Sequence, residues 1–218
     1  MERKIKCAVF DLDGTLVNTI DDLGNTCNFL IEKYGYKYVW NKNDYKKFVG
    51  NGAKKLVERA FGGKLSGDEL ERIYAEFKVI YERTMLDNAY AYEGIKEQLD
   101  ILKSKGIKLC VVTNKPNIAA QGMVEHFFGK GYFDVISGVV DGKPTKPDPY
   151  TTLLALKSVG CLPDEAIYFG DSNVDMRTAR NAGIEAVGVT WGFRSFEELF
   201  AENPSVIIDK PEYISKLI

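Results

Sequence analysis

The stretch Ile5–Thr19, IKCAVFDLDGTLVNT, decides how the rest of this chain is interpreted. A short apolar run, typical of a buried strand, ends in Asp11 and Asp13, and Gly14 and Thr15 follow directly. Side chains two residues apart on a strand point to the same side, so we expect both carboxylates to lie together. Neighbouring carboxylates repel each other unless a cation lies between them or one keeps its proton. The stretch therefore predicts a metal-bound carboxylate beside a proton donor.

Further apolar runs of strand length follow the first one, and stretches with helical periodicity separate most of them. The expected strands are residues 5–10, 108–113, 134–140, 166–171, 185–190 and 205–209, and examples of the helices between them are 95–105, 118–128, 150–159 and 176–182. Strands that alternate with helices, and that are apolar throughout, favour a parallel sheet covered on both faces. The predicted fold class is therefore α/β.

One interval, from about Thr19 to Tyr92, breaks this alternation. It contains no convincing strand and shows helical periodicity over residues 21–34, 43–49, 53–61 and 67–86. A helical block inserted after the first strand is expected to form a separate lobe. We therefore predict two domains, a core made of residues 1–17 and 91–218 and an all-helical cap domain made of residues 18–90.

The composition excludes several classes of function. The chain has 218 residues, 29 basic and 31 acidic residues and a formal net charge of −2. The lysine-rich stretch at residues 37–47 is mixed with tyrosine, tryptophan and asparagine, and we interpret it as a solvated face rather than an RNA or membrane site, so a nucleic-acid partner is not expected. No run approaches the roughly 20 apolar residues of a membrane span, and the first residues lack the apolar segment of a signal peptide, so no membrane association is expected.

The cysteine and histidine content narrows the location and the chemistry. The four cysteines, Cys7, Cys27, Cys110 and Cys161, form no closely spaced pair, which favours a reducing, cytoplasmic location. His126 is the single histidine of the sequence and lies in a helix-like stretch. A lone structural histidine leaves no Ser-His-Asp or Cys-His mechanism available.

Polar side chains follow several of the predicted strands at the point where each strand ends. Ligands of open parallel sheets bind outside the carboxyl ends of the strands, so these residues should converge. They are Asp11 and Asp13 after the first strand, Thr113, Asn114 and Lys115 after the second, Lys146 in a loop after the third, and Asp171 and Ser172 after the fourth.

The chemistry of this set points to phosphoryl transfer. Asp11, Asp171 and Asp175 offer hard oxygen ligands, with no cysteine or histidine among them, which favours Mg²⁺ over zinc. Asp175 has a second interpretation, in which it caps the following helix together with Ser172. Thr113, Asn114 and Lys146 suit a phosphate group. A metal-bound carboxylate beside a phosphate site favours transfer of the phosphoryl group to an aspartate, with proton transfer by Asp13.

With these residues in place, the chain resembles the haloacid dehalogenase-like hydrolase superfamily over essentially its whole length. The motifs that carry the resemblance are DLDGT at 11–15, TN at 113–114, Lys146 in KPDP and GDSNVD at 170–175. The resemblance implies a Rossmann-like core with a helical cap inserted after the first motif.

The resemblance also implies a role for each motif residue. Asp11 is implied as the nucleophile and a Mg²⁺ ligand. Asp13 is implied as the acid and base, with its main-chain carbonyl on the metal. Asp171 is implied as a direct metal ligand and Asp175 as a direct or more distant one. The phosphate would be held by Thr113, Asn114 and Lys146.

Within this superfamily the chain is most similar to phosphoglycolate phosphatase-like proteins. The segment VGNGAKKLVERAF at 49–61 is similar to the glycine-rich specificity loop and following helix of that group. Gly50 and Gly52 allow a tight backbone, and the free N–H groups of the following helix and Lys54 would attract an anionic part of the substrate. The other interpretation of Gly50 and Gly52 is a simple turn between cap helices.

We therefore expect a cytoplasmic, Mg²⁺-dependent phosphatase that hydrolyses a small phosphorylated metabolite, similar to 2-phosphoglycolate, through an aspartyl-phosphate. Three alternatives stay open at this point, namely a phosphosugar mutase, a pyrophosphatase of the same fold, and a non-catalytic phosphate-binding regulatory protein. The sequence leaves open whether the protein is a monomer or a homodimer.

Overall fold

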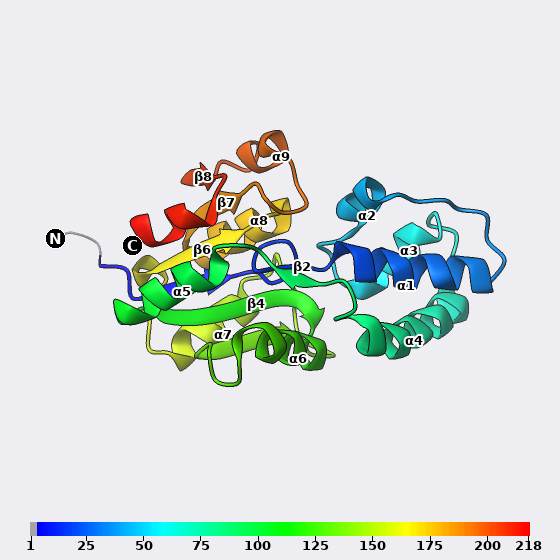
Figure 1. The fold of residues 1–218 in the computed structure, drawn as a ribbon, viewed down its shortest axis with the longest axis horizontal. Coiled ribbons are helices and arrows are strands. Elements are labelled where there is room, and N and C mark those ends of the chain that lie inside the picture. Colours follow the sequence, from blue (N-terminus) through cyan, green and yellow to red (C-terminus); the bar gives the residue numbers. More distant parts are fainter. Residues whose placement is uncertain (1–3) are drawn as a thin grey trace.

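The computed structural model of this protein describes residues 4–218, so the first residues of the predicted core segment 1–17 lie outside the described part. Six parallel strands form one sheet in the order β5-β4-β1-β6-β7-β8 (Figure 1). The strands are β1 (Cys7–Phe10), β4 (Lys108–Pro116), β5 (Val135–Val139), β6 (Ala166–Gly170), β7 (Glu185–Val189) and β8 (Val206–Ile208). The predicted parallel α/β fold is confirmed.

Helices cover both faces of this sheet because the strand residues alternate between two apolar clusters. Ala8 and Phe10 pack on the side of α5 (Ile95–Ser104) and α6 (Asn117–Phe128), whereas Cys7 and Val9 pack on the opposite side. The opposite side is covered by α7 (Tyr150–Ser158), α8 (Asn173–Ala182) and α9 (Phe196–Phe200). Two 3₁₀ helices, Pro163–Glu165 and Pro211–Lys216, complete the core.

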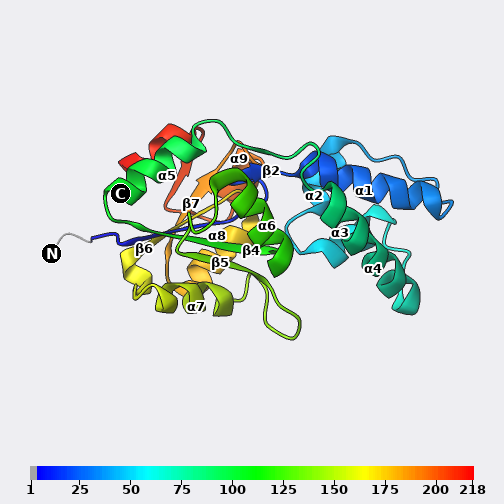
Figure 2. The same cartoon turned by 60° about the horizontal axis from the view of Figure 1, so that its bottom comes forward.

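Four helices form a block beyond the carboxyl end of the sheet (Figures 1 and 2). They are α1 (Ile20–Lys33), α2 (Lys42–Phe48), α3 (Ala53–Ala60) and α4 (Gly67–Thr84), each close to its predicted range. Apolar residues at helical spacing, such as Ile73, Phe77 and Tyr81 on α4, are buried between them. We call residues 20–84 the helical insert.

The two connections between core and helical insert form a small antiparallel ribbon that the sequence did not predict. β2 (Val17–Asn18) pairs with β3 (Tyr90–Ala91), which corrects the expectation that no strand lies between Thr19 and Tyr92. Strands this short leave no alternation pattern to detect. The buried carboxylate of Asp22 accepts hydrogen bonds from the main-chain N–H groups of Asn88 and Ala89, and so fixes the returning segment to α1.

Candidate active site

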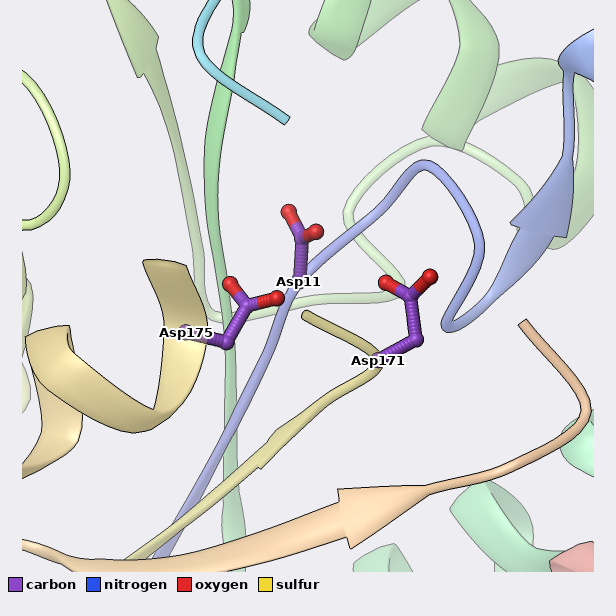
Figure 3. A group of neighbouring side chains, drawn as sticks. All are labelled: Asp11, Asp171 and Asp175. Atoms are coloured by element: carbon purple, nitrogen blue, oxygen red, sulfur yellow. The ribbon is translucent and has the colours of Figure 1, made fainter. Parts of the chain in front are cut away.

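Three aspartates from separate chain segments meet at the carboxyl edge of the sheet. Asp11 directly follows β1, Asp171 directly follows β6, and Asp175 lies in the first turn of α8. One carboxylate oxygen of each lies within 4.8 Å of the others, and all three residues are buried. Figure 3 shows Asp171 and Asp175 on either side of Asp11. The convergence expected from the strand ends is therefore present.

Glycines make room for the acidic cluster. A Cβ atom on Gly14, whose φ is +94°, would lie 2.3 Å from Asp171 Oδ2. A Cβ on Gly192 would lie 2.3 Å from Asp171 Cβ, and one on Gly170 would lie 2.2 Å from Asp175 Cβ. Because no real side chain tolerates such distances, these glycines are required for the carboxylates to approach each other this closely.

Lys146 supplies a buried positive charge within this cluster. Its Nζ donates to Asp175 Oδ1 at 2.6 Å and to the carbonyl of Val112 at 3.0 Å. It also forms an ion pair of 2.8 Å with Asp11 Oδ1, although that oxygen accepts no well-formed hydrogen bond within residues 4–218. Lys146 Nζ donates a further hydrogen bond, of 3.2 Å, to Tyr168 Oη. The Lys146 ammonium is thus held between the carboxylates of Asp11 and Asp175.

Burial changes the acid strength of the cluster. It raises the pKa of Asp11 to about 7, and the nearby Asp175 carboxylate contributes to the rise while Lys146 opposes it. Burial also raises the pKa of Asp171 well above its usual range, together with the charges of Asp175 and Asp11. The pKa of Lys146, which burial alone would lower, is raised by the carboxylates of Asp11 and Asp175. A cluster of this kind is short of positive charge and favours a bound cation.

Asp171 and Asp175 are oriented by different neighbours. Asp171 accepts hydrogen bonds from Phe193 N–H at 2.7 Å and from the Thr15 hydroxyl at 3.3 Å. Asp175 forms a reciprocal capping box with Ser172, whose hydroxyl donates to Asp175 Oδ2 at 2.6 Å. Both interpretations of Asp175 therefore have a structural basis, since it caps α8 and also lies in the acidic cluster.

Asp13 is not part of the group of three aspartates, and its carboxylate pairs with Lys115. Lys115 Nζ lies 2.9 Å from Asp13 Oδ1 and donates to Tyr81 Oη at 2.7 Å. Tyr81 belongs to α4, so this lysine joins Asp13 to the helical insert. The Asp13 carboxylate keeps the pKa of Lys115 above its usual value despite burial, and burial raises the pKa of Tyr81 to about 12. Lys115 is therefore a buried ammonium and Tyr81 a neutral phenol.

Thr113 and Asn114 line the same pocket as Lys146, but their side chains form different hydrogen bonds. Asn114 Nδ2 donates at 3.0 Å to the carbonyls of Gly50 and of Lys146, and its Oδ1 accepts from the Lys146 N–H at 2.9 Å. The Thr113 hydroxyl oxygen accepts a hydrogen bond from the Lys115 N–H, and the residue lines the pocket described next. Asn114 therefore connects the loop of Lys146 to the helical insert.

A pocket lies between the acidic cluster and the helical insert. Gly50 and Gly52, whose φ values are +113° and +88°, line it together with Leu23, Val49 and Leu56. Lys54 does not line this pocket. Its ammonium pairs with Glu71, and the residue borders a neighbouring hollow. The structure thus brings the predicted glycines to the site and leaves the predicted lysine outside it.

Two tyrosines that no feature of the sequence predicted there belong to the surroundings of the site. Tyr81 and Tyr168 touch Lys115 and Lys146 respectively, and Arg194 joins the loop after β7 to the helical insert. A tyrosine on an apolar helical stripe and another inside an apolar strand are typical core residues. Their sequence positions therefore give no signal of contact with the site.

Comparisons with known proteins agree with this arrangement. A family model of haloacid dehalogenase-like hydrolases matches residues 8–189. A phosphoglycolate phosphatase of Agrobacterium fabrum is 35% identical over 205 residues, which cover 93% of this chain and 87% of the relative. A phosphoglycolate phosphatase of Nitrosospira multiformis is 30% identical over 218 residues, which cover 98% and 96% of the two chains.

Solved structures show the same fold. A protein of Lactobacillus delbrueckii subsp. bulgaricus superposes with a TM-score of 0.92 at 33% identity, over 99% of this chain and 98% of the other. A predicted phosphoglycolate phosphatase of Haemophilus somnus superposes with a TM-score of 0.91 at 29% identity, over 100% and 99% of the two chains.

The sheet order and the buried acidic cluster at its carboxyl edge define the class of this protein, an α/β protein with a candidate active site at the strand ends. The chain belongs to the haloacid dehalogenase-like hydrolases. Within residues 4–218, no helix has both the length and the apolar character that crossing a membrane requires.

Proposed function

We propose that this protein is a cytoplasmic, Mg²⁺-dependent phosphatase that hydrolyses a small phosphate monoester, similar to 2-phosphoglycolate, through an aspartyl-phosphate on Asp11. The observation that carries the proposal is the meeting of Asp11, Asp171 and Lys146 at the end of β1, with Asp13 two residues further along. The names of the relatives that align over nearly the whole chain support the substrate class. We further propose that residues 18–90 act as a cap over a core of 1–17 and 91–218.

The donor set fits a Mg²⁺ ion. Asp11, Asp171 and Asp175 offer carboxylate oxygens only, which suit a hard divalent cation, and neighbouring glycines make room for two of them, Asp171 and Asp175. We propose Asp11 and Asp171 as direct ligands with the main-chain carbonyl of Asp13, and Asp175 as a direct ligand or as a support of Lys146. A bound Mg²⁺ offsets the repulsion between a carboxylate and a phosphate dianion.

The residues of this chain can then divide the reaction into two displacements. In the first, an oxygen of Asp11 attacks the phosphorus and the phosphorus–oxygen ester bond breaks. Asp13, which must be protonated in the substrate complex, gives its proton to the leaving oxygen. In the second, water attacks the phosphorus of the aspartyl-phosphate, Asp13 takes a proton from that water, and inorganic phosphate leaves. Asp11 and Asp13 are thereby restored to their starting states.

Lys146 and Thr113 are the groups we propose to hold the transferred phosphate. Lys146 would place a positive charge beside the phosphate, and a direct bond to it requires the release of one of its three acceptors. Thr113 lines the same pocket. Asn114 is proposed as a third holder. Its amide group already donates to two carbonyls, so a direct bond to phosphate requires the release of one of them. Gly50 and Gly52 would contact the rest of the substrate.

Phosphate release tests this function. We would measure release from 2-phosphoglycolate, other small phosphoesters and pyrophosphate, with Mg²⁺ and with EDTA. Mg²⁺-dependent release is expected, and Asp11→Asn should lower it at least about a thousandfold while the protein stays folded. Asp68→Asn, on the exposed first turn of α4, is the matched control and should keep full activity.

The same assay separates the alternatives. Release from pyrophosphate alone would indicate a pyrophosphatase. Isomerisation of a phosphosugar with little phosphate release would indicate a mutase. No turnover of any kind, or full activity of Asp11→Asn, would contradict the proposal.

A further inference from the structure

We propose that Lys115 is the residue that selects the substrate: its ammonium binds a carboxylate on the carbon next to the ester oxygen, so the substrates are phosphate esters of small 2-hydroxy acids. This inference rests on the proposed function, because it assumes that the ester oxygen leaves from the side of Asp13. Three observations carry it, and they concern the donors of Lys115, its distance from Asp13 and the walls of the pocket.

The first observation is that Lys115 is buried and has a donor to spare. Only 4% of the residue is exposed, and an ammonium group has three hydrogens. One is donated to Asp13 and one to Tyr81, and no third acceptor is present within residues 4–218. Since Lys115 lines the pocket, the remaining hydrogen can be donated to a bound molecule. Lys146, the other buried lysine of the pocket, is by contrast held among Asp11, Asp175 and Val112.

The second observation is the position of Lys115 relative to the reacting bond. An acid that protonates the leaving oxygen lies about 2.6–3.2 Å from it. Lys115 Nζ lies 2.9 Å from Asp13 Oδ1, so the ammonium would lie close to a leaving oxygen that Asp13 protonates. A carboxylate on the neighbouring carbon spans this gap with one hydrogen bond. A carboxylate attached further along the leaving group would lie too far from the ester oxygen to bind Lys115.

The third observation is the character of the remaining walls. Leu23, Val49 and Leu56 of the helical insert close the pocket around Lys115 and Tyr81. Apolar walls exclude water, which strengthens a charge-assisted hydrogen bond and penalises any polar group that finds no partner. One ammonium and one phenol therefore suit a single carboxylate on a short leaving group.

The binding of this carboxylate also involves both parts of the chain. Tyr81 Oη accepts from Lys115, which leaves the phenol hydrogen available as a second donor to the same carboxylate. Lys115 belongs to the core and Tyr81 to the helical insert. A substrate carboxylate would thus be bound by the core and the helical insert together.

The test compares two esters that differ only at the proposed carboxylate. We would measure kcat/KM for 2-phosphoglycolate and for ethyl phosphate with the wild type and with Lys115→Met. The wild type should prefer 2-phosphoglycolate, and Lys115→Met should lower the ratio of the two kcat/KM values about 30-fold, as expected for the loss of a charge-assisted hydrogen bond. Lys157→Met, on the exposed face of α7, is the matched control and should leave the ratio unchanged.

Two further variants keep the test decisive. Tyr81→Phe should lower the same ratio of kcat/KM values about fivefold. This variant tests the proposal even if Lys115→Met does not fold. In the background of Asp11→Asn, Lys115→Met should weaken the binding of 2-phosphoglycolate, measured by calorimetry with Mg²⁺, much more than the binding of ethyl phosphate. This readout would not change if Lys115 only positioned Asp13.

The failures of the two proposals are distinguishable. If the wild type releases phosphate from neither ester nor from any other, the proposed function is wrong. If the wild type hydrolyses both esters equally well, the phosphatase activity is confirmed and the role of Lys115 is overturned. The same conclusion follows if Lys115→Met slows both esters equally and still binds 2-phosphoglycolate with the same preference over ethyl phosphate.

Discussion

The guanidinium of Arg194 donates a hydrogen bond of 2.6 Å to the main-chain carbonyl of Val49. It also donates to the carbonyls of Lys46 and Lys47, at the carboxyl end of α2. The preceding residue, Phe193, donates its N–H to Asp171 at 2.7 Å. One loop of the core therefore contacts both the acidic cluster and the helical insert, next to the glycine loop that lines the pocket.

Removal of this guanidinium should loosen the helical insert and weaken substrate binding. Arg194 is 9% exposed, and hydrogen bonds from a charged group contribute more than neutral ones. We expect Arg194→Ala to raise KM for the preferred ester about tenfold and to change kcat less than about threefold. Steady-state kinetics and limited proteolysis of the helical insert measure these effects.

Glu198→Gln is the control for this variant. Glu198 is 3.9 Å from Arg194, and its side chain is 55% exposed, so their ion pair should contribute little. Equal effects of the two substitutions, or an unchanged KM in Arg194→Ala, would show that the bonds to α2 do not matter for binding.

A matched pair of glycine substitutions tests the space around the acidic cluster. In Gly192→Ala the new Cβ would lie 2.3 Å from Asp171 Cβ and 2.4 Å from the carbonyl oxygen of Gly14, so Asp171 must move. We expect a lower melting temperature and at least about tenfold weaker Mg²⁺ binding, measured by calorimetry.

Gly122→Ala should have the opposite effect on stability. Gly122 lies on the exposed face of α6, where the nearest atom to a new Cβ is Met85 Cε at 3.5 Å. Since alanine loses less conformational entropy than glycine in a helix, stability should rise by about 0.5–1 kcal/mol. Tolerance of both substitutions alike would contradict the close approach of Asp171 to Gly14 and Gly192.

The sequence predicts the sheet and the acidic cluster because both follow from local patterns. Each strand is an apolar run that ends in polar residues, and the carboxyl ends of parallel strands meet at one edge. This reasoning places Asp11, Asp171 and Lys146 together although they are far apart in the chain. The long helices of the insert are equally predictable, since their apolar residues recur with helical spacing.

The features that escape prediction depend on which elements pack against each other. The pairing of β2 with β3 involves two residues in each strand, too few for a periodic signal. Lys54 lies outside the pocket, and its ammonium pairs with Glu71 on another helix. The contact of Lys115 with Tyr81 requires the orientation of α4 over the end of β4. No local pattern in the sequence contains that information.

The raised pKa of Asp11, about 7, predicts a specific dependence of stability on pH. A carboxyl group with a higher pKa in the folded than in the unfolded protein binds an extra proton when folded. Without Mg²⁺, this contribution to stability is fully present at acidic pH and is lost as the pH rises toward about 7. The melting temperature of the metal-free protein should therefore fall over that range.

Mg²⁺ should reverse this dependence, because the cation takes the place of the proton among the carboxylates. The increase in melting temperature on addition of Mg²⁺ should be larger at about pH 8 than at about pH 5.5. Calorimetry at about pH 6 in buffers of different ionisation enthalpy should detect proton release on Mg²⁺ binding, and much less release at about pH 8. Asp11→Asn should reduce the release. Proton uptake on binding would contradict the interpretation.

Lys146→Met tests the charge balance of the acidic cluster, because the Lys146 ammonium pairs with both Asp11 and Asp175. Its side chain is 3% exposed and lies 2.8 Å from Asp11 and 2.6 Å from Asp175. Lys146→Met keeps the length and removes the charge, so the transferred phosphate loses a desolvated, charge-assisted partner. We expect kcat/KM to fall about a thousandfold while the far-ultraviolet circular dichroism is unchanged.

The same variant should also change Mg²⁺ binding, since two carboxylates lose their internal counter-charge. Mg²⁺ should then stabilise Lys146→Met more strongly than it stabilises the wild type, relative to each metal-free protein, because the cation becomes the only nearby positive charge. The measurement is the shift of the melting temperature with Mg²⁺ concentration, with Lys157→Met as the control. An unchanged kcat/KM would remove Lys146 from the site, and an unchanged Mg²⁺ shift would show that the ammonium does not balance the charge of the metal-binding carboxylates.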